Sequence, residues 1–157
     1  MPTFAIESNG RLEKTAVYYN GEQISGIKEL FINIDEDGTF DALIQYEGTN
    51  KQIYTKNIFL DYLDNIKVID PVFTEEEAQL LQLFTIESNG ELDDTYLYLN
   101  DELLEGVVNL FIHIKGVENK NGLRKLFNKD NIPDTVEFKA EITFRNEDDS
   151  LETERIF

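Results

Sequence analysis

The side chains that could act in catalysis are few, apart from the carboxylates. The chain has 157 residues, with 32 Asp and Glu, one His and no Cys. A Ser-His-Asp mechanism would have to use His113, which lies between Ile112 and Ile114, so we expect a solvated side chain pointing away from the apolar face of a strand. The sequence contains no nucleophile elbow, phosphate-binding glycine loop or zinc-protease motif, and it singles out no pair of acids for a glycosidase. We therefore predict that the protein is not an enzyme.

Two further patterns suggest ligand chemistry. Asp35–Asp41, with the sequence DEDGTFD, faintly resembles a calcium loop, but its glycine follows the second Asp too early, so the pattern favours a hairpin turn. Tyr18, Tyr19, Tyr96 and Tyr98 could form an exposed aromatic stripe, as in carbohydrate-binding modules. The chain has no Trp, which favours the alternative that Tyr18 and Tyr98 cover the rim of the core. We expect no cofactor and no metal, and calcium or sugar binding remains an alternative.

The charge is unusual, because 14 basic residues leave a net charge of −18. Such a surface repels phosphates, so we expect no direct binding of nucleic acid, and the attractive partner is a basic protein. The N-terminus has no secretory pattern, and no apolar stretch approaches the ~18 residues that a membrane helix needs. We expect a soluble, cytoplasmic protein that does not bind membranes.

The sequence repeats itself after 80 positions. Residues 4–34 and 84–114 align without gaps and share 16 identities in 31 positions, including FAIESNG against FTIESNG. The match resumes with FDALIQY against FKAEITF, where the second copy carries 18 extra residues. This pattern indicates a tandem duplication with one insertion.

Each copy has the alternating pattern of short antiparallel strands. Leu30–Ile34 and Phe40–Ile44 alternate around a loop of residues 36–38, and a glycine in the left-handed position of that loop would pair Ile34 with Phe40. For IESNGRL we prefer a three-residue loop of residues 8–10, which pairs Ile6 with Leu12 and makes ESNG a duplicated turn rather than a ligand loop.

A third turn is indicated by YNGE at residues 19–22 and by its counterpart LNDE at residues 99–102. Between the copies, Thr74 and Glu77 form a capping box, which predicts a short helix over residues 75–82. We therefore expect an all-β, mainly antiparallel protein: two copies of a ~70-residue, six-stranded sandwich or open barrel, with a small helical insertion in the second. The predicted units are residues 1–70, a linker helix at 71–82, and residues 83–157, and the two copies are expected to share an interface.

The copies differ most in charge. Residues 74–114 contain ten acidic residues and no Lys or Arg. We interpret this acidic run either as a solubilising face or as a surface that imitates the phosphates of nucleic acid. Its members are Glu75, Glu76, Glu77, Glu87, Glu91, Asp93, Asp94, Asp101, Glu102 and Glu105.

The insertion, residues 115–136, is basic and lies where the first copy has its DEDG turn. A helix there would present apolar residues on one face and basic residues elsewhere, so it could bind a partner, the protein's own acidic face or a second copy. The candidate binding residues are Lys120, Leu123, Arg124, Lys125, Phe127 and Lys129.

The leading hypothesis is a non-enzymatic, acidic protein-binding module that antagonises a host protein which itself binds nucleic acid. In composition the chain is similar to phage-encoded inhibitors, which would place it in the host cytoplasm. The alternative is a structural protein that forms homo-oligomers through the insertion and the sheet edges.

Overall fold

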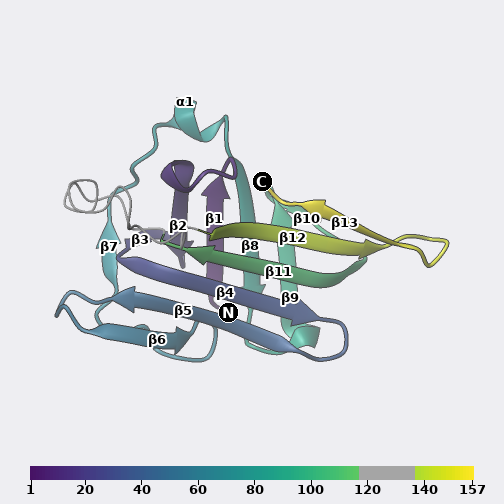
Figure 1. Ribbon diagram of the computed structural model, residues 1–157, viewed down its shortest axis with the longest axis horizontal. Coiled ribbons are helices and arrows are strands. Elements are labelled where there is room, and N and C mark those ends of the chain that lie inside the picture. The colour runs from purple at the N-terminus through teal and green to yellow at the C-terminus, as the bar shows by residue number, and fades with distance from the viewer. Residues whose placement is uncertain (117–136) are drawn as a thin grey trace, which may run out of the picture.

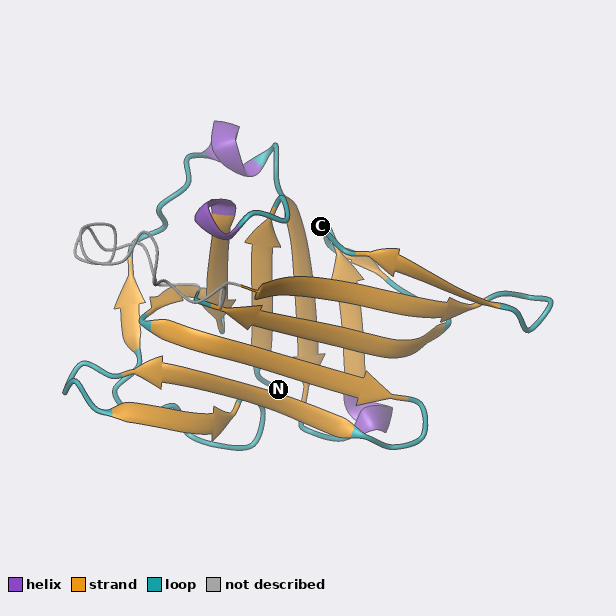
Figure 2. Cartoon of the chain, viewed as in Figure 1, coloured by secondary structure: helices purple, strands orange, loops and turns teal. Residues whose placement is uncertain are grey.

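The computed structural model describes residues 1–116 and 137–157, which form two antiparallel β-sheets (Figures 1 and 2). The seven-stranded sheet has the order β10-β9-β8-β1-β2-β3-β7. Its strands are β1 (Thr3–Ser8), β2 (Thr15–Tyr19), β3 (Glu22–Ser25), β7 (Lys67–Ile69), β8 (Gln82–Ser88), β9 (Thr95–Leu99) and β10 (Glu102–Leu103).

The six-stranded sheet has the order β13-β12-β11-β4-β5-β6. Its strands are β4 (Ile27–Asp35), β5 (Phe40–Glu47), β6 (Ile53–Asn57), β11 (Val107–Lys115), β12 (Glu137–Arg145) and β13 (Leu151–Arg155). In Figure 1 its strands run crosswise to those of the seven-stranded sheet.

The two copies meet in the middle of both sheets. Strand β1 pairs with β8 so that Ala5 lies opposite Thr85, and β4 pairs with β11 so that Ile32 lies opposite Ile112. Each of these residues therefore lies opposite its own sequence counterpart. The two strands of each central pair are thus related by a local two-fold axis. Each copy contributes three strands to each sheet, and the first copy adds β7.

One hydrophobic core contains residues from both copies and both sheets. Alternate residues of each central strand point inward, as the pleat of a β-strand requires. The fully buried apolar side chains on the four central strands are Phe4, Ile6, Ile27, Leu30, Ile32, Phe84, Ile86, Leu110, Ile112 and Ile114.

Two of the three predicted turns are confirmed. Ile34 pairs with Phe40, and Gly38 has φ of +103° in the loop, as predicted for the β4–β5 hairpin. In the β2–β3 turn Asn20 and Gly21 have φ of +50° and +85°, and in the β9–β10 turn Asn100 and Asp101 have φ of +51° and +68°. Asp101 thus adopts the left-handed conformation that its counterpart Gly21 adopts without a Cβ.

The predicted register of the first hairpin is wrong. Ile6 lies opposite Val17 rather than Leu12, and Ser8 lies opposite Thr15. The buried hydroxyl groups of Ser8 and Thr15 are 2.8 Å apart, and Ser8 Oγ accepts the Gly10 amide at 3.0 Å. These side-chain bonds replace a tight hairpin turn with a longer loop, which contains the 3-10 helix η1 (Leu12–Lys14). The second copy repeats the arrangement with η2 (Leu92–Asp94).

The tyrosines of β2 lie on opposite faces. Tyr19 packs against the core, whereas Tyr18 lies opposite Ala5 on the face turned away from it. The Tyr18 hydroxyl donates to Glu7 Oε1 at 2.8 Å. The expectation that Tyr18 covers the rim of the core is therefore wrong, and Tyr98, opposite Thr85, lies on the same outer face.

The linker helix is shorter than predicted. Helix α1 spans Glu75–Ala78, and the predicted capping box is present, because Thr74 Oγ1 accepts the Glu77 amide while Glu77 Oε1 accepts the Thr74 amide. The helix buries no side chain, so no packing stabilises a further turn. In the part of the chain that the structure describes, no helix is long and apolar enough to cross a membrane.

The DEDG segment forms a hairpin turn. The Gly38 amide donates to the Asp35 carbonyl at 3.1 Å, and the Thr39 amide donates to Asp37 Oδ1 at 2.8 Å. The bonds from Thr39 lower the pKa of the Asp37 carboxyl. Within residues 1–116 and 137–157 no group of three or more acidic or histidine side chains could hold a metal ion.

Candidate functional site

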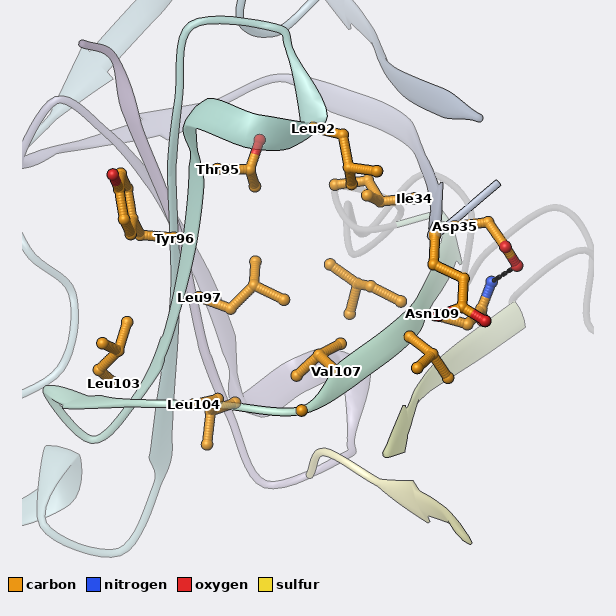
Figure 3. Close-up of a pocket in the computed structure, with 14 residues that line it drawn as sticks. Ile34, Asp35, Leu92, Thr95, Tyr96, Leu97, Leu103, Leu104, Val107 and Asn109 are labelled. Carbon is orange, nitrogen blue, oxygen red and sulfur yellow. Dashed lines mark hydrogen bonds between the residues drawn. The ribbon is translucent and has the colours of Figure 1, made fainter. Parts of the chain in front are cut away.

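A pocket of about 320 Å³ opens beside β9, β10 and β11 in the second copy. Figure 3 shows Leu97 of β9 and Val107 of β11 pointing into the space between their strands. Leu92, Leu103 and Leu104 also line it. The wall is largely apolar, as is typical of binding sites for ligands or side chains.

Asp35 at the end of β4, Glu36 in the β4–β5 turn and Asn109 of β11 also line the pocket. Asn109 Nδ2 donates to Asp35 Oδ2 at 3.0 Å, the bond that Figure 3 draws as a dashed line. Glu36 also lines the pocket, and its Oε1 accepts a bond from Arg145 Nη2 at 2.6 Å. Both carboxylates are therefore already paired within the protein, Asp35 with an amide and Glu36 with a cation.

The corresponding region of the first copy is closed by the chain itself. Strand β3, the counterpart of β10, pairs with β7, and the Val72 amide donates to Gln23 Oε1 at 3.0 Å. Gln23 is 5% exposed, whereas its counterpart Leu103 is 50% exposed. In the first copy β7 and Val72 thus cover the strand edge that is unpaired in the second copy among the described residues.

Strand β10 is an edge of the seven-stranded sheet among the described residues. Its backbone pairs with β9 through Glu102 and Leu103, and the Leu104 amide donates to the Leu97 carbonyl at 2.8 Å. An unpaired edge beside an apolar pocket is a common place for a peptide to bind.

The acidic run does not form one continuous surface. In α1, Glu77 lies 3.8 Å from Lys14 Nζ, near η1. Strand β8 then carries the chain to the other end of the sheet, because Gln82 lies opposite Ser8 whereas Glu87 lies opposite Thr3. Glu75, Glu76 and Glu77 are thus at the opposite end from the acids of η2.

Five members of the run lie next to residues that line the pocket. Glu91, Asp93 and Asp94 flank or belong to η2, whose Leu92 lines it, and Glu102 and Glu105 flank Leu103 and Leu104. Asp101 lies in the turn at the far end of β10. These five acids are therefore sequence neighbours of residues that line the pocket, and Asp35 and Glu36 line it themselves.

The other predicted binding residues are in the insertion. Lys120, Leu123, Arg124, Lys125, Phe127 and Lys129 lie outside the described residues.

His113 faces away from the core, as expected, but it is not a solvated side chain. Its Nε2 lies 2.7 Å from Glu29 Oε2, and its ring packs edge-on against Phe31 at 5.8 Å. The side chain is only 20% exposed. A carboxylate on the neighbouring strand was not visible in the local sequence, because Glu29 is 84 positions away.

The sequence interpretation missed Leu103 and Leu104, and it named Tyr96 only as part of a possible aromatic stripe. A signal was present at two of these positions, because the first copy has Gln23 where the second has Leu103, and Ala16 where it has Tyr96. Comparing the copies for apolar residues, and not only for charge, would have indicated that the second copy exposes a surface here.

No family model, curated protein or solved structure matches the chain. What the protein binds must therefore be inferred from the pocket, the edge of β10 and the acidic side chains around them.

Proposed function

We propose that the protein is a non-enzymatic protein-binding module whose partner is basic. The observation that carries this proposal is the apolar pocket of about 320 Å³ beside an unpaired edge strand, with Asp35 and Glu36 in its lining and five further acids next to lining residues in the sequence. Protein interfaces commonly have an apolar centre and a polar or charged rim. The centre contributes most of the affinity, and the rim contributes to specificity.

The charge of the chain supports a basic partner. The net charge of −18 attracts a cationic surface over a distance set by the salt concentration, about 8 Å at physiological ionic strength. Residues 74–114 contribute ten acidic residues and no Lys or Arg. Binding should therefore weaken as salt is added.

More specifically, we propose that the partner is a nucleic-acid-binding protein and that this module competes with its nucleic acid. Proteins that bind phosphates present clusters of Lys and Arg, and such clusters also attract an acidic protein. On this proposal, DNA or RNA and the module exclude each other from the partner.

We also propose that the chain arose by tandem duplication and that its two sheets pack as a sandwich. The 16 identities between residues 4–34 and 84–114 support the duplication, and one core with side chains from both sheets supports the sandwich. On this proposal, the predicted units 1–70 and 83–157 are repeats in the sequence, and both contribute strands to each of the two sheets.

The test is a pull-down with the tagged protein from a bacterial lysate, eluted with a salt gradient and repeated with competing DNA. We expect a basic nucleic-acid-binding protein to be captured and to be released by both salt and DNA. The triple variant Glu91→Gln, Asp93→Asn, Asp94→Asn should release it at lower salt. A matched variant, Glu22→Gln, Glu75→Gln, Glu76→Gln, loses the same charge away from the pocket and should behave like the unchanged protein.

Recovery of the bait alone, or capture that salt does not affect, would contradict the proposal. The mass of the protein in solution would then test the alternative, self-assembly through the insertion. Deletion of residues 115–136 should reduce an oligomer to a monomer if the insertion joins the copies.

A further inference from the structure

The outer edge of β10 offers backbone groups for a further strand. The Leu104 amide points toward β9, where it donates to the Leu97 carbonyl at 2.8 Å. Because successive residues of a strand point their backbone groups to opposite sides, the amides and carbonyls of Leu103 and Glu105 point away from β9. No strand within residues 1–116 and 137–157 pairs with that side.

The first copy shows which strand such an edge takes. Strand β7 runs antiparallel to β3, with Lys67 opposite Ser25, Val68 opposite Ile24 and Ile69 opposite Gln23. The counterparts of these β3 residues in the second copy are Glu105, Leu104 and Leu103. A strand with the Lys-Val-Ile sequence of β7 would therefore find a carboxylate opposite its lysine and a leucine opposite each apolar residue.

This pairing fits β10 better than it fits β3. Opposite charges and pairs of apolar side chains directly across two strands are favourable, each by a few tenths to about 1 kcal/mol. In β3 the lysine faces a serine, and the isoleucine faces a glutamine. In the first copy the cation is held instead by Glu47, whose Oε2 lies 3.5 Å from Lys67 Nζ, and the second copy has Arg145 at the position of Glu47. A cation on a strand added to β10 would thus rely on Glu105.

The pocket gives the added strand an anchor. Leu104 lines the pocket, and side chains that lie opposite each other in an antiparallel pair point to the same face. The residue opposite Leu104 would point toward the pocket. An apolar cavity of about 150 Å³ holds a benzene molecule, so this pocket of about 320 Å³ has room for one large apolar side chain.

We propose that β10 accepts an extended segment of a partner protein as an additional antiparallel strand. The segment has Lys or Arg opposite Glu105 and apolar side chains opposite Leu104 and Leu103. The proposal rests on the proposed function in that a protein partner supplies the segment, and it adds the site, the register and the residue types that the site selects.

The probe is a peptide with the sequence of residues 65–73, titrated into the full-length, isotope-labelled protein. The largest shifts of amide signals in NMR spectra should come from residues 103–107, and exchange of the Leu103 and Glu105 amide hydrogens should slow. Chemical shifts that change elsewhere, or exchange at Leu103 that does not slow, would overturn the proposal.

The edge itself is tested with Leu103→Pro. The Leu103 amide points away from β9, so proline removes only the bond to the added strand, a change that edge strands accept. We expect the affinity for the peptide to fall about tenfold, because the variant loses one backbone hydrogen bond to the peptide. The matched variant Leu103→Val keeps the amide and should bind within about threefold of the unchanged protein. Equal binding by both variants would overturn the proposal.

The register is tested by exchanging charges. Glu105→Lys should weaken binding of the peptide, and a peptide with glutamate at the position of Lys67 should bind this variant better than it binds the unchanged protein. If both peptides bind both proteins alike, the register is wrong.

If the free peptide binds weakly, the same segment can be fused to the protein. A short tether gives it a local concentration near millimolar, so that it occupies the site. Phe157 corresponds to Phe59, so residues 60–72 appended after Phe157 follow the same path toward β10 that the chain takes toward β3. Exchange at Leu103 should slow at least tenfold in this fusion, and no slowing would overturn strand addition. Capture of a basic partner that Leu103→Pro leaves unchanged would also overturn strand addition while leaving the proposed function intact.

Discussion

At the scale of single residues, the two copies share buried polar groups that local patterns do not reveal. Ser8 and Ser88 are both fully buried, and each hydroxyl lies 2.8 Å from a threonine hydroxyl, of Thr15 or of Thr95. Each serine Oγ also accepts the amide of the glycine two residues later. The repeated ESNG sequence therefore builds a loop whose hydrogen bonds lie inside the protein.

Ser8→Ala and Ser88→Ala should each destabilise the protein by about 1–3 kcal/mol, because each change removes a hydrogen bond to the threonine hydroxyl and leaves the amide of Gly10 or Gly90 without its acceptor. Chemical denaturation measures the effect. The hydroxyl of Ser25 makes no hydrogen bond among the described residues, so Ser25→Ala is the control and should change the stability by less than about 0.5 kcal/mol. Similar values for all three variants would contradict the role of the buried pairs.

Tyr46 is a second buried polar residue. Its hydroxyl donates to the Asp64 carbonyl at 2.7 Å, and burial, together with the nearby Asp64 carboxylate, raises its pKa to about 12. The pKa of a tyrosine in the unfolded chain is about 10. The neutral phenol therefore stabilises the folded state fully below pH 10, and this contribution is lost as the pH rises toward 12.

Tyr46→Phe should cost about 1 kcal/mol at pH 7, where the Asp64 carbonyl loses its donor. Between pH 10 and 12 the gap between the two proteins should narrow, because only the unchanged protein has this phenol to ionise. Urea denaturation at several pH values checks this expectation, with the exposed Tyr96→Phe as the control. A gap that stays constant above pH 10 would contradict it.

At the scale of elements, turns with strong backbone requirements were predictable and loops held by side chains were not. The β4–β5 register follows from Gly38 and from alternation along both strands, which are local properties. The β1–β2 loop depends on a bond between Ser8 and Thr15, seven positions apart, and that bond overrides the simpler turn. Helix α1 began at its predicted capping box but ended early, since nothing packs on it.

The pocket was harder to predict because it arises from long-range pairing. Its two sides come from the β4–β5 turn and from β9–β11, which approach only because β4 pairs with β11. The acidic side chains near it could be predicted from composition, whereas the opening itself depends on which edge β7 covers. No local pattern shows that β7 pairs with β3.

The β9–β10 turn offers a test at this scale. Asp101 has φ of +68°, where its counterpart Gly21 has +85°. Asp101→Gly should stabilise the protein by about 0.5–1 kcal/mol by removing a Cβ from a left-handed position. Asp101→Asn removes the same charge but keeps the Cβ, so it should give a smaller gain. If thermal denaturation shows the same increase in stability for both variants, the loss of charge, and not the loss of the Cβ, causes the increase.

At the scale of the whole molecule, each copy completes the sheets of the other. The pairs β1–β8 and β4–β11 place Ala5 opposite Thr85 and Ile32 opposite Ile112. An isolated first copy would have both inner edges unpaired, together with the apolar faces beside them. A second molecule of the same fragment presents nearly the same edges in the same two-fold register.

A fragment of residues 1–72 should therefore form a homodimer through β1 and β4. Sedimentation equilibrium should give twice the fragment mass, and the unfolding midpoint should rise with protein concentration. The full chain, in which both edges are already paired, serves as the reference. A folded monomeric fragment would show that the first copy does not need a partner.

The same pairing affects synthesis on the ribosome. The inner edges of β1 and β4 have no pairing partner until β8 and β11 are synthesised, about 80 positions later in the chain. At about 5–20 residues per second, two hydrophobic strands with free edges remain unpaired for roughly 4–16 seconds. During that time they can pair with the same strands of another nascent chain on the same messenger RNA, which gives swapped dimers. The inner edges of the first copy are thus the segments that a nascent-chain chaperone has to cover.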